Sequence, residues 1–236
     1  MNALVASNVS AAALAIDWTA FMQPIQLSLL VALLASPITT AIGTIVAWKM
    51  SNSRCRGKSL LETAFMLPMV LPPTVVGFLL LLLLGRRSWL GGLIEELFHQ
   101  PIIFTWPAAV IASVVVSFPL VYQSMKTGFA AIDRDLLAAG RSMGGSEWQL
   151  FRFVALPLAG GSLLNAFVLS FARSLGEFGA TLMIAGNIPG RTQTVPTAIY
   201  VAVDSGNMPM AWAWTTAVVA VSFVLLLATG RRKRDS

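Results

Sequence analysis

The sequence predicts an all-α integral membrane protein, a helical bundle that crosses the bilayer several times. Of its 236 residues, 56% are hydrophobic and only 11% are charged, whereas a soluble domain carries about 25% charged residues. The mean hydropathy is +0.77. The apolar residues also run in blocks that approach the ~20 residues a helix needs to cross a bilayer. These observations exclude a soluble globular domain.

Five apolar segments are long enough to form the core transmembrane helices. We expect them at residues 26–48, 60–84, 106–125, 157–185 and 210–229. The second segment contains the run LPMVLPP, with Pro68, Pro72 and Pro73. Prolines remove backbone donors and kink a helix. Lipid tolerates such a kink only where neighbouring helices or a cavity satisfy the freed carbonyls. The kink is therefore either a structural bend or part of a pore lining.

The two ends of the chain are expected to lie outside this bundle. Residues 1–20 contain no Lys or Arg, so they lack the basic start of a cleavable signal peptide. We expect an extracytoplasmic tail there, or a short, partly inserted sixth helix. Residues 21–230 would form a single transmembrane domain, and residues 231–236 a basic cytoplasmic tail.

The positions of the basic residues orient the bundle. With the N-terminus outside and the C-terminus inside, 12 of the 16 basic residues face the cytoplasm: Lys49, Arg54, Arg56, Lys58, Lys126, Arg134, Arg141, Arg152 and the four at 231–234. Arg86, Arg87 and Arg191 fall outside, and Arg173 lies within a span. Such a bias sets the orientation of membrane proteins. It also accounts for the pI of 10.3 without a nucleic-acid partner.

The sequence offers no set of residues for catalysis or metal binding. The single histidine, His99, has no Cys, His or Asp neighbour at ligand spacing. The single cysteine, Cys55, excludes an internal disulfide. No glycine-rich nucleotide-binding motif of the GxxxxGK[ST] type occurs. We therefore expect that the chain is not an enzyme and holds neither a metal nor a cofactor.

A polar loop at residues 133–152 interrupts the apolar spans and would lie in the cytoplasm. Asp133 is a good N-cap for a first short helix, which Gly144 and Gly145 would end. Ser146 would cap a second helix, with Gln149 at the capping-box position. That helix would gain an apolar surface from Trp148, Leu150, Phe151 and Phe153. The alternative is an amphipathic helix lying in the membrane interface.

Two charged residues, Arg173 and Glu177, fall near the middle of the fourth expected span. A charge at that depth is costly, and residues four apart share a helix face and can pair. The pair is either a structural ion pair that locks helices together or part of a polar track or gate. Gly176, Gly179 and Gly186 permit close helix approach or a break in the helix.

Residues 191–200, RTQTVPTAIY, are too polar to span the membrane and too long for a turn. We expect a re-entrant segment or an outer gate, in which Thr192, Thr194 and Thr197 offer hydroxyl donors. For each threonine taken singly, an ordinary loop hydroxyl is the alternative interpretation.

Several stretches resemble one protein family. Permease subunits of bacterial ATP-driven importers carry a loop of the form E-A-A, three residues, G, nine residues, I, one residue, L-P. The matching residues here are Ala138, Ala139, Gly140, Gly144, Val154, Leu156 and Pro157. Ala138 replaces the glutamate of the pattern and Gly140 its second alanine. Residues 67–87, 173–181 and 187–200 resemble the molybdate permease subunit, and sulfate and thiosulfate permeases share a looser version.

The resemblance implies a coupling helix in the loop at 133–152 that seats in a groove of a separate ATPase subunit. Its residues would be Ala138, Ala139, Gly140, Gly144, Ser146, Trp148, Leu156 and Pro157. Arg173, Gly176, Glu177, Gly179 and Thr181 would form the translocation path or an intramembrane pair.

The resemblance also implies the partners and the function. We expect a homodimer in the lipid of a bacterial cytoplasmic membrane, with two ATPase subunits that hold ATP and Mg, and an extracytoplasmic oxyanion-binding protein. The expected function is import of molybdate or tungstate. Import of sulfate or thiosulfate is the alternative. A secondary ion-coupled transporter is a weaker one, because five spans show no internal repeat.

Overall fold

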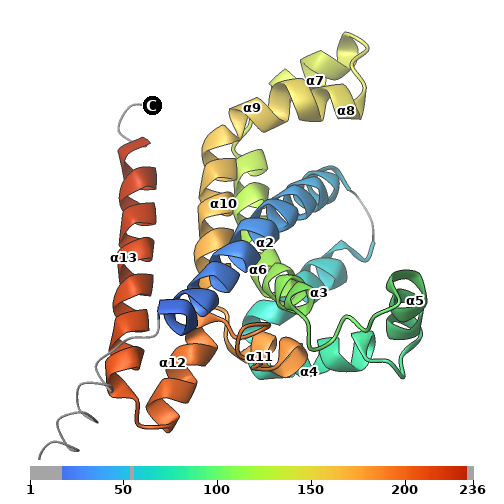
Figure 1. The fold of residues 1–236 in the computed structure, drawn as a ribbon. Coiled ribbons are helices and arrows are strands. Elements are labelled where there is room, and N and C mark those ends of the chain that lie inside the picture. Colours follow the sequence, from blue (N-terminus) through green and yellow to red (C-terminus); the bar gives the residue numbers. More distant parts are fainter. Residues whose placement is uncertain (1–17, 54–55, 233–236) are drawn as a thin grey trace, which may run out of the picture. The chain divides into compact units, whose positions relative to one another are not determined.

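The computed structural model describes residues 18–53 and 56–232, and every regular element in these ranges is a helix (Figure 1). The predicted all-α fold class is therefore confirmed. Most of the expected N-terminal segment, as well as Arg54, Cys55 and residues 233–236 of the basic tail, lies outside the described residues. Residues 18–20 already belong to the first described helix.

The helices form two compact units. One unit is Leu29–Gly186, and the other combines the chain before Leu29 with the chain after Gly186. The larger unit contains most of α2 (Trp18–Asn52), followed by α3 (Lys58–Val70), α4 (Pro73–Leu84), α5 (Trp89–Phe98), α6 (Trp106–Ala130), α7 (Arg134–Ser142), α8 (Glu147–Leu150), the π-helical turn η1 (Phe151–Ala155), α9 (Leu156–Leu158), α10 (Gly160–Leu175) and α11 (Gly179–Ala185). The other contains α12 (Val195–Asp204) and α13 (Met208–Arg232).

Helix α6 lies at the centre of the larger unit and packs against α10, α3, α11 and α4. Its alanines Ala108, Ala109 and Ala112 are fully buried, and small side chains allow helices to approach closely in a membrane. Figure 1 shows α7 and α8 at one end of α6 and α10, and α4 and α11 at the other. This arrangement separates the polar loop at 133–152 from the Arg173 region by the length of α10.

The first, third and fifth expected spans correspond to α2, α6 and α13. In the described chain, α2 and α6 are each long and apolar enough to cross a membrane as single helices. Helix α2 is longer than expected because it begins at Trp18 and continues to Asn52. The apolar segment expected at 210–229 lies within α13.

The second expected span is not one helix. It consists of α3 and α4, which are bent by 113° at the break between them. Leu71 and Pro72 have extended backbones, with ψ angles of 145° and 136°, because the residue before a proline is driven out of the helical region. The kink expected from the LPMVLPP run is thus confirmed, and it is a complete interruption.

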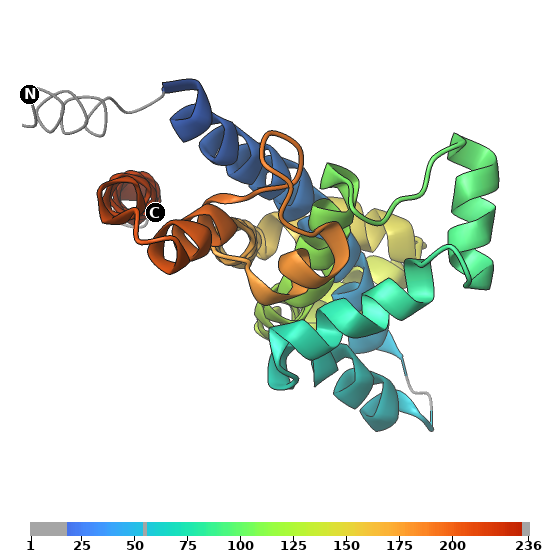
Figure 2. The same cartoon turned by 60° about the horizontal axis from the view of Figure 1, so that its bottom comes forward.

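Helix α4 then packs on α11, and the two helices lie side by side in Figure 2. Gly77 makes this approach possible, because a Cβ atom added there would lie 2.7 Å from Ala180 Cα.

The expectation of one continuous fourth span at 157–185 is also wrong. The segment Glu147–Leu158 meets α10 at an angle of 78°, so Pro157 belongs to α9 before the bend. At the other end, α10 stops at Leu175, with Gly176 as its C-cap, and α11 restarts the helix at Gly179. The expected span is thus divided among a segment before α10, α10 itself and α11, and Gly176 and Gly179 flank the break between α10 and α11.

The smaller unit is held together by packing around Trp214 of α13. The indole Nε1 of Trp214 donates to the carbonyl oxygen of Phe21 at 2.9 Å, and the two rings stack with centroids 6.4 Å apart. The backbone N–H of Val195 donates to Ser28 Oγ at 2.8 Å. These hydrogen bonds connect α12 and α13 to the N-terminal turns of α2.

Candidate functional site

The loop at 133–152 folds as a pair of short capped helices, as the sequence predicts. Asp133 Oδ1 accepts a hydrogen bond from the backbone N–H of Asp135 at 2.9 Å and so caps α7. Gly144 follows the end of α7 with a φ angle of 84°, a left-handed conformation that glycine adopts without strain. The N–H of Gly145 then donates to the carbonyl of Gly140 at 3.1 Å.

The capping box expected at Ser146 is also present. Ser146 Oγ accepts from the N–H of Gln149 at 3.3 Å, and Gln149 Oε1 accepts from the N–H of Ser146 at 2.8 Å. These two bonds satisfy donors that the start of α8 would otherwise leave unpaired.

Gly140 brings α7 and α8 into contact. A Cβ atom added at Gly140 would lie 2.5 Å from Leu150 Cδ2. An alanine there, as in the importer pattern, would require Leu150 to shift. Glycine in place of the alanine of the importer pattern therefore leaves room for the Leu150 side chain. Ala138, which stands in place of the glutamate, is exposed, as is Ala139.

An ion pair fixes the same two helices and reaches α2. Arg141 Nε lies 2.6 Å from Glu147 Oε1, and Arg141 Nη2 donates to Glu147 Oε2 at 3.3 Å. Asn52 Nδ2, at the end of α2, also donates to Glu147 Oε2 at 3.3 Å. The hydrogen bond from Arg141 lowers the pKa of Glu147 below its ordinary value and raises the pKa of Arg141. Glu147 thus stays ionised near neutral pH.

The apolar residues of the loop divide into two groups. Trp148 and Phe153 are exposed by 61% and 69%, but Leu150 and Phe151 are buried, at 3% and 6%. The expectation that all four form one apolar surface is therefore wrong for Leu150 and Phe151, which face the protein. The exposed group is extended by Met143, which is 88% exposed.

Phe151 anchors the loop through an aromatic cluster, which we define as Trp48, Phe129 and Phe151. The ring centroid of Phe151 lies 5.7 Å from that of Trp48 and 6.3 Å from that of Phe129. Trp48 and Phe129 are themselves 5.3 Å apart. Aromatic contacts at these distances stabilise a fold beyond the area that they bury. The cluster joins the loop to α2 and α6. The contacts of Phe151 with Trp48 and Phe129 were not predicted from the sequence.

The segment after Phe151 continues as the π-helical turn and reaches Leu156 and Pro157. The N–H of Leu156 donates to the carbonyl of Phe151, five residues back. Leu156 is half-buried and Pro157 is exposed. Both residues precede the bend into α10, which places the end of the importer pattern at that bend.

Arg173 and Glu177 form the predicted ion pair, with Arg173 Nη1 2.5 Å from Glu177 Oε2. They do not share one continuous helix, because α10 ends between them. Glu177 Oε1 accepts from the backbone N–H of Ala180 at 2.9 Å, in the first turn of α11. The Glu177 side chain is 1% exposed and that of Arg173 is 29% exposed. Glu177 therefore bridges the break between α10 and α11.

The neighbouring residues of this motif are closely packed. Gly179 lies against the start of α4, where an added Cβ would come within 3.1 Å of Pro73 Cβ. Thr181 is buried, at 1% exposure. Gly176 ends α10, and its N–H donates to the carbonyl of Ala172 at 3.3 Å. The five residues named for a translocation path are thus gathered at one helix break.

The three threonines named for an outer gate are all buried and bonded within their own segment. Thr192 Oγ1 accepts from the N–H of Ile188 at 3.0 Å. Thr197 Oγ1 donates to the carbonyl of Thr194 at 2.7 Å, and the two side-chain oxygens are 3.3 Å apart. Each hydroxyl therefore has a hydrogen-bond partner within residues 188–197, and their role in an outer gate stays a prediction.

A buried hydroxyl cluster, not identified from the sequence, joins three helices of the larger unit. Ser117 Oγ of α6 lies 3.4 Å from Thr39 Oγ1 of α2 and accepts from Ser170 Oγ of α10 at 3.3 Å. All three side chains are fully buried. Small hydroxyl residues in apolar spans were the available signal, because such residues hydrogen-bond between membrane helices.

Replacing Glu177 should show how much the break depends on this residue. Glu177→Ala removes both the cap of α11 and the partner of Arg173, and breaking a buried ion pair in this way costs about 3 kcal/mol or more. We expect a lower unfolding temperature for the purified protein. Glu177→Gln keeps an acceptor for Ala180 and should lose less. Equal stability of the wild type and the alanine variant would contradict the bridging role.

Known proteins resemble this chain over most of its length. The family described as "Binding-protein-dependent transport system inner membrane component" matches residues 39–231. YvgM of Bacillus subtilis (strain 168), whose name assigns it provisionally as a molybdenum transport system permease, is 53% identical over 231 residues, with 98% of this chain and 99% of that protein covered.

Two further relatives are named for two different substrates, molybdenum and sulfate. The molybdenum transport system permease protein ModB of Escherichia coli (strain K12) is 40% identical over 183 residues, covering 78% of this chain and 80% of ModB. The sulfate transport system permease protein CysW of Synechococcus elongatus is 34% identical over 219 residues, covering 90% of this chain and 76% of CysW. The resemblance to molybdate permeases is confirmed, and the sulfate alternative is weaker.

Solved structures show the same fold at low sequence identity. A bacterial ABC transporter that imports alginate has a TM-score of 0.75 at 14% identity, covering 92% of this chain and 79% of the other. The MetNI methionine ABC transporter has a TM-score of 0.67 at 16% identity, covering 91% and 95%. The chain belongs to the family of inner membrane components of binding-protein-dependent transport systems, as a permease subunit without catalytic function of its own.

Proposed function

We propose that this chain is the permease subunit of an ATP-driven importer that carries molybdate, or tungstate, into the cytoplasm. The observation that carries the proposal is the identity to molybdenum transport permeases. It exceeds the identity to the sulfate permease, and for one relative it extends over nearly the whole of both chains.

The transporter would contain two copies of this chain with the pore between them, N-termini outside and C-termini inside. Two ATPase subunits would bind ATP and Mg on the cytoplasmic side, and an extracytoplasmic binding protein would deliver the anion. The alginate transporter, which has a similar fold, has been solved in complex with a periplasmic protein, and this supports the kind of partner. The proposed domain, 21–230, would be the transmembrane domain of this assembly.

The exposed side chains of the loop at 133–152 would contact the ATPase subunit. Met143 and Trp148 project from the α7–α8 pair, while the capping bonds and the Arg141–Glu147 ion pair hold that pair rigid. A rigid element with exposed apolar side chains can receive force without deforming. The residues Ala138, Ala139, Gly140, Gly144, Ser146, Leu156 and Pro157 would shape this element rather than make most of its contacts.

The force would reach the membrane by two routes. The aromatic cluster links the loop to α2 and α6, and the Asn52–Glu147 bond links it to the end of α2. The bend before α10 links it to α10, whose far end is bridged to α11 by Glu177. Movement of the loop would thus shift α2, α6 and α10 together and alternately open the two ends of the pore.

In this account, the Arg173–Glu177 pair mainly maintains the helix break, because both carboxylate oxygens of Glu177 are already engaged. Arg173→Gln distinguishes a gate from a structural pair. A gate predicts an intact complex that no longer transports, whereas a purely structural pair predicts loss of the folded complex.

Truncating Trp148 should weaken association with the ATPase subunit. Loss of an aromatic side chain at the centre of an interface costs on the order of tenfold or more in affinity, so we expect less ATPase to co-purify with Trp148→Ala. Leu97→Ala is a matched control, because Leu97 is 74% exposed on α5, outside the loop. Unchanged co-purification for Trp148→Ala would contradict the docking role of the loop.

Cellular molybdenum, measured by mass spectrometry, tests the substrate. Cells that carry the gene should accumulate several-fold more molybdenum at limiting molybdate than cells without it, and excess sulfate should leave that difference intact. If sulfate removes the difference, or if the gene supports sulfur uptake instead, then the substrate belongs to the sulfate class.

A further inference from the structure

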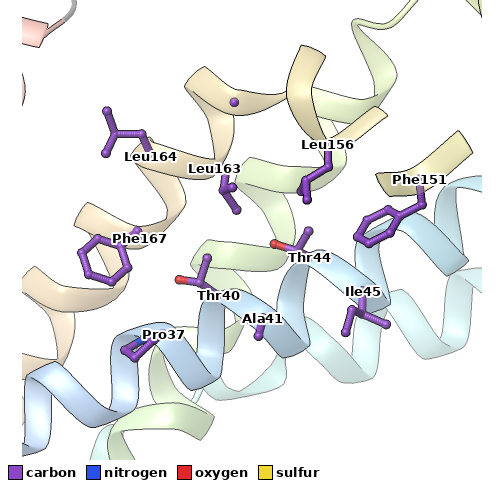
Figure 3. A pocket seen from close by; sticks show the side chains of 11 residues that line it. Pro37, Thr40, Ala41, Thr44, Ile45, Phe151, Leu156, Leu163, Leu164 and Phe167 are labelled. Carbon is purple, nitrogen blue, oxygen red and sulfur yellow. The ribbon is translucent and has the colours of Figure 1, made fainter. Parts of the chain in front are cut away.

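An apolar groove of about 570 Å³ runs between α2 and the segment η1–α10. Its walls are formed by residues 37–45 on one side and 151–167 on the other (Figure 3). Both walls belong to the larger unit. No carboxylate lines the groove, which lies apart from the Arg173–Glu177 pair, and Phe151 of the aromatic cluster closes one end of it. An oxyanion path would need polar walls, so the groove is unsuited to the transported anion.

Two threonines of α2, Thr40 and Thr44, line this groove. The side chains of Thr40 and Thr44 extend toward α10 in Figure 3, and the residues are only 8% and 4% exposed. Neither Oγ1 atom has a hydrogen-bond partner in the part of the chain that the structure describes. By contrast, Thr39 and Ser36 on the same helix donate to carbonyls one turn back, at 2.8 and 2.6 Å. A buried hydroxyl without a partner is unfavourable, so rotation of either side chain toward an acceptor in the groove would be favourable.

Two cations follow lining residues at the loop end of the groove, and Arg152 lies over the ring of the exposed Phe153, 5.7 Å from its centroid. Lys49 is one helical turn beyond Ile45, which lines the groove, and Arg152 directly follows Phe151 at its end. Both cations are exposed, and within residues 18–53 and 56–232 neither forms an ion pair with a carboxylate. Long basic side chains near the end of a membrane helix extend toward the interface. They can reach an anionic group there.

We propose that the groove binds one phospholipid from the leaflet on the side of the loop at 133–152. An acyl chain lies along the apolar walls, Thr44 and Thr40 rotate about χ1 to donate to the ester carbonyls, and the phosphate lies beside Lys49 and Arg152. Lys49 is five residues beyond Thr44, which is about 7.5 Å along the helix. Phosphate and ester groups follow one another in that order in a phospholipid. Two cations favour a headgroup with net negative charge.

A second copy of the chain fits the groove less well. Another apolar helix would fill the space but would offer no acceptor to Thr40 and Thr44, because its backbone carbonyls are already bonded within the helix. The lipid satisfies the hydroxyls, the apolar walls and the cations together. The proposal relies on the membrane-embedded permease of the proposed function, but not on its substrate.

A lipid in this position would link the two walls beside the bend before α10. Gly160, the first residue of α10, is one of the lining residues. Occupancy would therefore set how far the start of α10 can move relative to α2. We expect the bound lipid to raise the unfolding temperature of the complex.

Native mass spectrometry of the purified transporter, with phosphatidylglycerol as the probe lipid, tests the proposal. The wild type should retain one phosphatidylglycerol per copy of the chain and should retain it longer than phosphatidylcholine. Ala41→Phe, which fills the groove, should abolish retention. The double substitution Thr40→Val and Thr44→Val, which keeps the shape, should reduce retention several-fold, as should Lys49→Gln. Ile42→Phe is the matched control, because Ile42 is exposed on α2 and does not line the groove.

Three results would overturn the proposal. Equal lipid retention by Ala41→Phe and Ile42→Phe would place the lipid elsewhere. Equal retention of both lipids, unaffected by Lys49→Gln, would mean ordinary bilayer contact only. Loss of the dimer in Ala41→Phe without loss of lipid would identify the groove as a seat for the second copy. None of these measurements depends on molybdate, so a failure here is distinct from a failure of the proposed substrate.

Discussion

Phe151 packs between Trp48 of α2 and Phe129 of α6, and the mechanical continuity of the larger unit depends on this contact. Leu137 and Leu150 of the loop at 133–152 are buried in the same apolar core. Through the aromatic cluster, the loop is in contact with both α2 and the central α6 helix. The Asn52–Glu147 bond adds a polar contact at the rim of the same junction.

The membrane imposes a second constraint, because every backbone break must have its polar groups satisfied by the protein. At two breaks in the larger unit, different groups form these hydrogen bonds. At the α3–α4 break, the N–H of Leu71 donates to the carbonyl of Leu67, and the N–H groups of Val75 and Val76 donate to the carbonyl of Pro72. The α10–α11 break is closed by Glu177, which uses one oxygen for the helix and the other for Arg173. The ionised residues inside the bundle therefore support irregular backbone.

The sequence predicts the local features well and the long-range contacts poorly. The caps at Asp133 and Ser146, the proline kink and the Arg173–Glu177 pair follow from residues close together in the chain, so spacing rules reach them. The partners of Phe151 lie on distant helices, and so do those of Ser117. The division of the loop into exposed Trp148 and buried Phe151 depends on the packing of Phe151 on Trp48 and Phe129, which no short pattern encodes.

ATP-driven molybdate uptake into vesicles tests most directly whether force passes through the aromatic cluster. The vesicles would contain this chain with its ATPase partner, carrying either Phe151→Ala or the exposed control Phe98→Ala. The account predicts that Phe151→Ala still binds the ATPase but takes up several-fold less molybdate per ATP hydrolysed, while the control resembles the wild type. Unchanged uptake per ATP in a folded Phe151→Ala complex would contradict it.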